Sequence, residues 1–242
     1  MRVSGFGTAT VWLPECPDVR LVQGFDQVVD YRPDDLVVRV GSRVRLDDLA
    51  ALLENDGLCL PILRNRGWLG YPGETVGGLV GLGLPHFHQE SVGAIRDWVI
   101  GMKMRLASGE VVTSGAGVVK SVAGFDLHRM MVGSRGSLAE ILEIGFRLSP
   151  IALKPREQEL PSFDGSTWIH RVPKGFVANH GIMDSSGRWI WSDRKLDIPP
   201  SGWGLGPGGT RFGSVDPISK QYRKNLKNAF DPNGVWTEGW KQ

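Results

Sequence analysis

The hydrophobic pattern is clearest in the first quarter of the chain. Residues 36–40 are rich in β-branched side chains and follow a Pro-Asp-Asp turn, which predicts a strand. From Leu46 the period changes, and four leucines recur at helical spacing through residue 53. Asp47 and Asp48 would fall in the first helical turn, where negative charge suits the helix dipole. We therefore predict a short amphipathic helix over residues 46–54.

Downstream, the pattern predicts a mixture of short strands and helices. Residues 98–113 predict a β-hairpin whose turn, 107–110, contains a glycine. Two short helical segments are expected at 127–131 and 138–142. Alternating apolar residues from 144 to 148, followed by Pro150, then predict a strand that closes this part of the chain.

Near Lys154 the pattern changes from mixed helices and strands to short strands and turns. Residues 155–197 predict a small antiparallel meander, with a hairpin formed by 168–172 and 176–180 and a second turn at 184–187. Residues 199–209 are rich in glycine and proline and predict a linker without helix or strand. Apolar residues then recur at helical spacing from 218 to 229, and the basic residues between them predict an exposed face: Lys220, Arg223, Lys224 and Lys227.

Composition narrows the class of protein. Of 242 residues, 41% are hydrophobic and 22% charged, which is typical of a folded domain, and the formal net charge of +2 gives no reason to expect nucleic acid as a partner. We expect no transmembrane segment, because no apolar run is long enough. Cys16 and Cys59 form neither a disulfide framework nor a metal site, so the expected location is the cytoplasm.

Glycine is the unusual residue. The chain has 33 glycines, and nine of them lie between residues 67 and 101. Glycine permits positive φ and close approach of the backbone to a partner, so this density favours loops around a ligand over ordinary surface turns. None of the clusters matches a P-loop or opens a helix in the Rossmann pattern.

Three glycine turns could present backbone N–H groups to a phosphate. The first follows a predicted short strand at the start of the chain. The turns are Gly5-Phe6-Gly7-Thr8, Glu74-Thr75-Val76-Gly77-Gly78 and Gly133-Ser134-Arg135-Gly136. Together they predict a ligand that carries phosphate.

Other chemistry has little support. The sequence has no Gly-x-Ser-x-Gly and no His-Glu-x-x-His motif. His86 and His88 could share a metal, but no third ligand completes the set, so we expect two loop histidines and no metal. The tryptophans of the second half could line a pocket or pack a small sheet.

Three strings between residues 91 and 150 carry a family resemblance. They are Gly93-Ala94-Ile95-Arg96-Asp97-Trp98-Val99-Ile100-Gly101, Val119-Lys120-Ser121-Val122-Ala123-Gly124-Phe125-Asp126-Leu127 and Gly133-Ser134-Arg135-Gly136-Ser137-Leu138. They resemble the FAD-binding domain of the vanillyl-alcohol oxidase type, and within it the E subunits of bacterial glycolate oxidases. Phe230-Asp231-Pro232-x-Gly234 resembles the C-terminal turn of that family. The likeness covers residues 1–150 and 218–239.

The resemblance implies an α+β fold: a two-lobed FAD-binding domain with a truncated first lobe and a small β-rich cap. The implied division is 1–150 for the FAD-binding domain, 151–210 for the cap and linker, and 211–242 for a helix and turn that return to the domain. Thr8 stands where a linking histidine is often found, so FAD should be non-covalent. The implied cofactor-binding residues are Gly5, Phe6, Gly7, Thr8, Thr75, Val76, Gly77, Gly78, Gly93, Gly133, Ser134, Gly136 and Ile141.

One departure from the family concerns Glu140, which replaces an aliphatic residue where the chain should run along the flavin. A carboxylate beside a pyrophosphate is unfavourable, and the residues of the expected cap define no catalytic set. Two functions stay open. The chain is either the FAD-binding subunit of a glycolate oxidase-like 2-hydroxy acid dehydrogenase complex, or a flavin-free structural subunit of such a complex. The implied partners are a homologous flavoprotein subunit and an iron–sulfur subunit, which could also hold the chain at the inner membrane.

Overall fold

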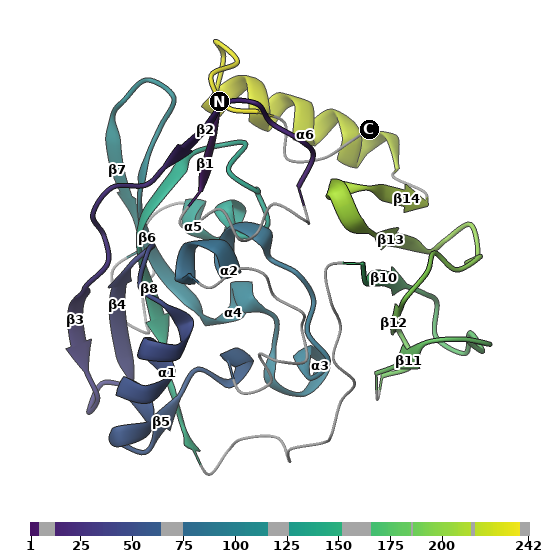
Figure 1. Cartoon of the computed structure of the whole chain (residues 1–242), viewed down its shortest axis with the longest axis horizontal. Helices are drawn as coiled ribbons and strands as arrows, with labels where there is room; N and C mark the ends of the chain where they lie inside the picture. Colours follow the sequence, from purple (N-terminus) through teal and green to yellow (C-terminus); the bar gives the residue numbers. More distant parts are fainter. Residues whose placement is uncertain are drawn as a thin grey trace.

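The computed structural model describes residues 1–4, 13–63, 75–115, 126–151, 166–184, 186–213 and 216–237 (Figure 1). Its main element is a five-stranded antiparallel sheet in the order β3-β4-β8-β6-β7. The strands are β3 (Val28–Arg32), β4 (Val37–Gly41), β6 (Val99–Arg105), β7 (Val111–Ser114) and β8 (Glu140–Arg147). The predicted strand at 36–40 and the predicted hairpin at 98–113 are thereby confirmed.

One face of this sheet forms the main core. Val38, Val40, Met102, Ile144 and Phe146 alternate along three strands and are almost completely buried. Short helices cover them: α1 (Leu46–Asn55), α2 (Val76–Leu82), α4 (Ile95–Trp98) and α5 (Leu127–Met131). The predicted amphipathic helix is confirmed as α1, and its Leu46, Leu49 and Leu53 are buried.

The prediction of a helix at 138–142 is wrong, because these residues lead into β8. Lys103 pairs with Glu143 but Met104 pairs with Ile141, so the register shifts and Leu142 is an extra residue in β8. Leu138 and Leu142 are both buried. Residues four apart lie on one face of a strand as well as on one face of a helix, so the spacing of these two leucines does not distinguish the two structures.

Smaller elements surround the sheet. β1 (Arg2–Ser4) and β2 (Val19–Leu21) form a parallel pair, while β5 (Leu58–Cys59) pairs with β9 (Ser149–Pro150). A 3₁₀ turn at Pro61–Leu63 and helix α3 (Gln89–Val92) complete this part. The predicted first strand is confirmed as β1, and the turn that should follow it, Gly5–Thr8, lies outside the described residues.

A second five-stranded antiparallel sheet lies beside the first unit, which consists of the main sheet and the elements around it (Figure 1). Its order is β11-β12-β10-β13-β14. The strands are β10 (Trp168–Arg171), β11 (Ile182–Met183), β12 (Trp189–Ser192), β13 (Trp203–Leu205) and β14 (Arg211–Gly213). The β-rich cap is therefore present, and its β11–β12 hairpin turns near the predicted site.

Two details of the predicted cap are wrong. Strand β10 pairs with β12 and β13, and residues 176–180 form no strand. The expected linker contains β13 and a 3₁₀ turn at Pro207–Gly209. Gly204 lies against the ring of Phe212, where any Cβ would clash. Gly204 leaves room for this ring, but a glycine in this segment also favours the prediction of a loop.

The cap packs on the first unit through a small apolar cluster. Leu84 and Phe87 lie against Ile169, Trp189 and Trp191 of the cap. The rings of Phe87 and Trp191 are 5.6 Å apart. Trp189 and Trp191 are buried, so their packing role is confirmed.

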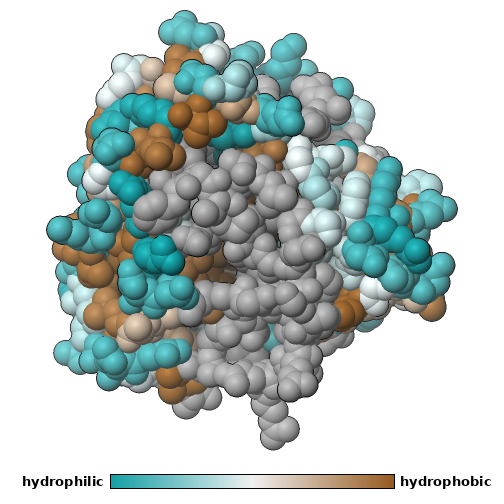
Figure 2. All heavy atoms as spheres, viewed as in Figure 1, coloured by the Kyte–Doolittle hydropathy of each residue, from teal (hydrophilic) through white to brown (hydrophobic). Residues whose placement is uncertain are grey.

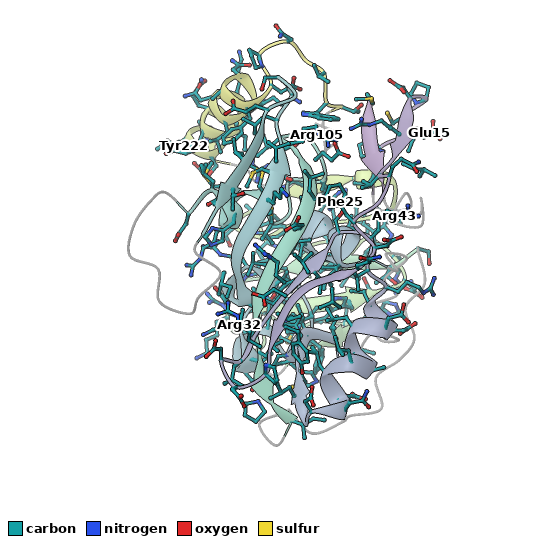
Figure 3. All side chains as sticks on the ribbon, turned by 90° about the vertical axis from the view of Figure 1, so that its left-hand side faces the viewer. Glu15, Phe25, Arg32, Arg43, Arg105 and Tyr222 are labelled. Carbon is teal, nitrogen blue, oxygen red and sulfur yellow. The ribbon has the colours of Figure 1, made fainter. Side chains whose placement is uncertain are left out.

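The predicted C-terminal helix is confirmed as α6 (Pro217–Phe230), capped by the side chain of Asp216. Its apolar side is open, since Ile218 is 78% and Tyr222 66% exposed, and Tyr222 projects outward in Figure 3. Lys227 was predicted on the exposed basic face, and this is wrong, because its side chain is largely buried. Among the described helices, none is long and apolar enough to cross a membrane.

Candidate cofactor site

Helix α2 connects two of the predicted glycine turns. Thr75 caps its N-terminus, and Gly83 ends it with a φ of +54°. Gly133 donates its N–H to the carbonyl of Val80 at 3.0 Å, and Arg135 donates to Gly81 at 2.8 Å. The structure therefore places Thr75–Gly78 at one end of α2 and Gly133–Gly136 at the other.

The N–H groups at the start of α2 already have partners inside the chain. Val76 donates to Val44 O at 3.0 Å and Gly77 to Ser42 O at 2.7 Å, while Gly78 donates to the hydroxyl of Thr75 at 3.1 Å. The expectation that this turn offers free N–H groups is wrong. A Cβ on Gly77 would lie 2.9 Å from Ser42 O. Glycine is needed here so that α2 can approach β4.

Gly93 is held by its neighbours. It has a φ of +90°, and its carbonyl accepts a hydrogen bond of 2.9 Å from Nε2 of His86. Burial lowers the pKa of His86 to about 4, so its ring is neutral at neutral pH. No group of three metal-binding side chains occurs in the described ranges. His86 therefore acts as a donor that fixes this backbone.

The Gly133–Gly136 turn leads directly to Glu140 and Ile141 at the start of β8. Ile141 is partly buried and pairs with Met104 of β6. Glu140 is 3% exposed, and its Oε2 accepts hydrogen bonds of 2.7 Å from both Arg20 and Arg105. Its negative charge is compensated within the chain, which removes the reason to regard it as incompatible with a nearby phosphate.

The C-terminal turn contacts this region through a lysine that the sequence placed in solvent. Nζ of Lys227 donates to the carbonyls of Ser137 and Trp236 and to the carboxylate of Asp231, at 2.6–2.8 Å. Asp231 also accepts from the N–H groups of Val235 and Trp236, each at 2.7 Å. The Phe230–Gly234 motif could have indicated this carboxylate. The contact to Ser137 joins residues 90 apart in the chain and leaves no local signal.

The titratable residues of the cap do not converge. His170 is fully buried, where its Nδ1 lies 3.3 Å from Ile190 O and its Nε2 accepts from the N–H of Leu196. His180 contacts the exposed Asp193 at 2.7 Å, and the guanidinium of Arg171 lies over the ring of Trp189. His170 is therefore a hydrogen-bonded residue of the cap's core. Arg156 lies outside the described residues.

Comparison with known families identifies the first unit. Residues 1–115 match the family described as "FAD binding domain". This part, just under half of the 242 residues, is similar to the FAD-binding domains of that family. FAD is the cofactor that this domain type binds.

Curated relatives extend the match beyond the FAD-binding domain. The glycolate oxidase subunit GlcE of Escherichia coli is 36% identical over 134 residues, which is 55% of this chain and 36% of that protein. A D-lactate dehydrogenase of Anaerostipes hadrus is 32% identical over 155 residues, 63% of this chain and 31% of that protein. Glycolate oxidase subunit GlcD of Bacillus subtilis is 32% identical over 136 residues, which is 54% of this chain and 27% of that protein. The chain spans about a third of the length of these relatives.

The FAD-binding domain has polar groups that suit a polar cofactor. The hydroxyls of Ser42 and Ser134 are buried and have no hydrogen-bond partner among the described residues. Ser42 lies against Gly77, and Ser134 belongs to the Gly133–Gly136 turn. An unpaired buried hydroxyl costs about 1–3 kcal/mol, so both groups would gain from a ligand that carries phosphate or hydroxyl oxygens. This pair of hydroxyls fits FAD.

Arg2, at the start of the chain, is a further buried polar group that fits FAD. Its side chain is 3% exposed, and Nη1 donates to Pro14 O, while Nε and Nη2 have no partner among the described residues. Arg2 lies in β1, whose last residue, Ser4, precedes the predicted Gly5–Thr8 turn. A buried cation next to a predicted phosphate loop fits an anionic cofactor.

Proposed function

We propose that this chain is the FAD-binding subunit of a glycolate oxidase-like 2-hydroxy acid dehydrogenase complex, with FAD bound non-covalently. The observation that carries the proposal is the FAD-binding domain over residues 1–115. The relatives named for glycolate and D-lactate oxidation indicate the substrate class. When bound, FAD supplies a two-electron acceptor for oxidation of an alcohol carbon.

Within this proposal, the chain's own residues bind and position the cofactor. Gly5, Phe6, Gly7 and Thr8, with the buried hydroxyls of Ser42 and Ser134, would hold its polar groups. Thr75–Gly78, Gly93, Gly133, Gly136 and Ile141 would shape its walls. Thr8 supports non-covalent attachment, because a threonine cannot replace the histidine that links flavin in related proteins.

A subunit role is favoured by the cap. Oxidation of a 2-hydroxy acid needs a cation for the carboxylate, a base for the hydroxyl proton and a cover that excludes water. In the described part of the cap, Arg171 stacks on Trp189, His170 accepts a hydrogen bond from Leu196, and His180 contacts Asp193. These side chains do not form a common site. We propose that a homologous flavoprotein subunit supplies this chemistry and that an iron–sulfur subunit accepts the electrons.

Exposed apolar residues support the same role. Val28 and Val29 of β3 are 42% and 44% exposed, and Figure 2 shows apolar atoms gathered on the side of the molecule formed by β3, β4 and α1. Contiguous apolar surface often marks a protein interface. A partner subunit would cover this side.

The test compares the chain alone with the chain co-expressed with its candidate partners. We expect dye reduction with glycolate or D-lactate only in the co-purified complex, and no turnover by the isolated chain. Robust turnover by a monomeric preparation would contradict the subunit role. Failure to co-purify with any partner would count against the complex.

A further inference from the structure

An open cleft lies between β2 and the end of the main sheet where β6 ends and β8 begins. Its volume is about 510 Å³, and we call it the arginine cleft, lined by Val19, Arg20, Leu21, Gln23, Arg105 and Glu140. This volume falls within the range of about 300–1,000 Å³ that is usual for ligand sites. Figure 3 shows Arg105 at the end of the sheet that faces β1 and β2.

Two arginines in this cleft are held by one buried carboxylate. Arg20 and Arg105 each donate to the same oxygen of Glu140 at 2.7 Å. Glu140 is 3% exposed, whereas the side chains of Arg20 and Arg105 are 44% and 35% exposed. A guanidinium has five N–H donors, so both retain donors that can face the cleft. Two positive charges and one negative charge leave the cluster with a net charge of +1.

The cleft lies next to predicted cofactor segments. β1 and β2 are parallel, with Ser4 opposite Leu21, so Leu21 lies beside the last described residue before the predicted Gly5–Thr8 turn. Glu140 directly precedes Ile141 and follows the Gly133–Gly136 turn. The chain therefore places a fixed positive charge between β2 and the start of β8.

We propose that the arginine cleft binds a phosphate group of the ADP half of FAD. Arg20 and Arg105 are the phosphate-binding side chains, and Glu140 is a positioning residue that holds their guanidiniums. Arginine suits this task because its planar fork matches the geometry of phosphate. The half-exposed Val19 and Leu21 provide apolar contact for the rest of the ADP group. This inference rests on the proposed function, since it assumes that the chain binds FAD.

The test is titration of the whole chain with FAD, with ADP as a competitor. Arg20→Met and Arg105→Met should each weaken FAD binding about tenfold or more, because each removes a charge-assisted hydrogen bond. The matched control is Arg39→Met. Arg39 lies 3.8 Å from Glu143, on a strand of the same sheet and outside the lining of the cleft, and its substitution should leave FAD affinity unchanged.

A second set of variants guards against misfolding. Loss of one arginine leaves Glu140 with a single partner, whereas Glu140→Gln keeps the shape and removes the negative charge. Glu140→Gln should weaken FAD binding several-fold, because it removes the charge that positions both guanidiniums. Arg20→Met should lower FAD affinity by a smaller factor in the Glu140→Gln background than in the wild type, because the guanidinium that it removes is then no longer held in place.

The outcomes separate the two proposals. If the wild-type chain binds FAD and both arginine variants bind it equally well, the arginine cleft is not a phosphate site and the proposed function stands. If the wild-type chain binds no FAD, both fall. Weaker FAD binding in both arginine variants, together with an unchanged Arg39→Met, supports the inference.

Discussion

At the scale of single residues, two glycines of α2 show why glycine count is a poor guide to function. A Cβ on Gly77 would lie 2.9 Å from the side chain and carbonyl of Ser42, whereas a Cβ on Gly81 would meet nothing within 4 Å. The sequence gives both the same appearance. Only the packing of α2 on β4 distinguishes them, because Ser42 lies 35 residues away from Gly77.

This contrast predicts opposite effects of the same substitution. Gly77→Ala should lower the free energy of unfolding by about 1–3 kcal/mol, because the methyl group overpacks the α2–β4 contact. Gly81→Ala should raise it by up to about 1 kcal/mol through better helix propensity. Urea unfolding of both variants measures the difference. Equal effects would show that Gly77 is not a packing glycine.

Histidine burial predicts how stability depends on pH. Burial lowers the pKa of His170 to about 4 from an ordinary value of 6.5. As the pH falls from 6.5 toward 4, the unfolded chain therefore takes up a proton before the folded chain does. His170 stabilises the fold fully above pH 6.5, and this contribution falls by up to about 1.4 kcal/mol per pH unit in that window.

Urea unfolding at pH 7, 6 and 5 tests this account of His170. The free energy of unfolding should fall less steeply with decreasing pH in His170→Asn than in the wild type. The pKa of His86 is also lowered to about 4, so His86→Asn should reduce the pH dependence of the free energy of unfolding in the same direction. Parallel pH profiles for wild type and variant would exclude His170 as a source of the dependence.

At the scale of elements, the C-terminal turn is fixed by one buried ion pair. Asp231→Ala removes the acceptor of Lys227 and of two backbone N–H groups. Because a buried lysine then lacks its counter-charge, stability should fall by about 3 kcal/mol. The control is Asp193→Ala, which breaks the exposed contact to His180 and should leave the melting temperature near that of the wild type. Similar losses in both variants would contradict the role of Asp231.

Elements with regular periodicity were predictable from the sequence, and those shaped by distant contacts were not. The leucines of α1 and the hairpin of β6 and β7 have patterns that their own residues determine. The start of β8 was predicted as a helix because Leu138 and Leu142 are four residues apart, a spacing that fits one face of a helix and one face of a strand equally well. β13 was not predicted because it contains Gly204, and glycine is typical of loops. The glycine is required there because the ring of Phe212, on the next strand, occupies the space of a Cβ.

The candidate site was predictable only in outline. Family resemblance and glycine spacing indicated FAD and the turns near α2. The occupied N–H groups of Val76–Gly78, the buried Ser42 hydroxyl and the Arg20–Glu140–Arg105 cluster depend on residues far apart in the chain. Such pairings have no signal in one sequence.

At the scale of the whole molecule, the first part of the chain and the cap share an apolar cluster that includes Phe87 and Trp191. Lys227 of α6 links the C-terminal turn to Ser137, which follows the Gly133–Gly136 turn. These links make the parts one framework around the predicted cofactor segments. The proposed function therefore requires that this framework binds FAD without a covalent bond.

The visible spectrum of the purified chain, followed by denaturation, tests that claim most directly. We predict a yellow protein, or one that turns yellow when FAD is added, whose flavin passes entirely into solution when the protein is precipitated. Flavin that stays with the precipitate would contradict non-covalent binding. A colourless protein that takes up no added FAD would contradict the account and favour the flavin-free structural subunit.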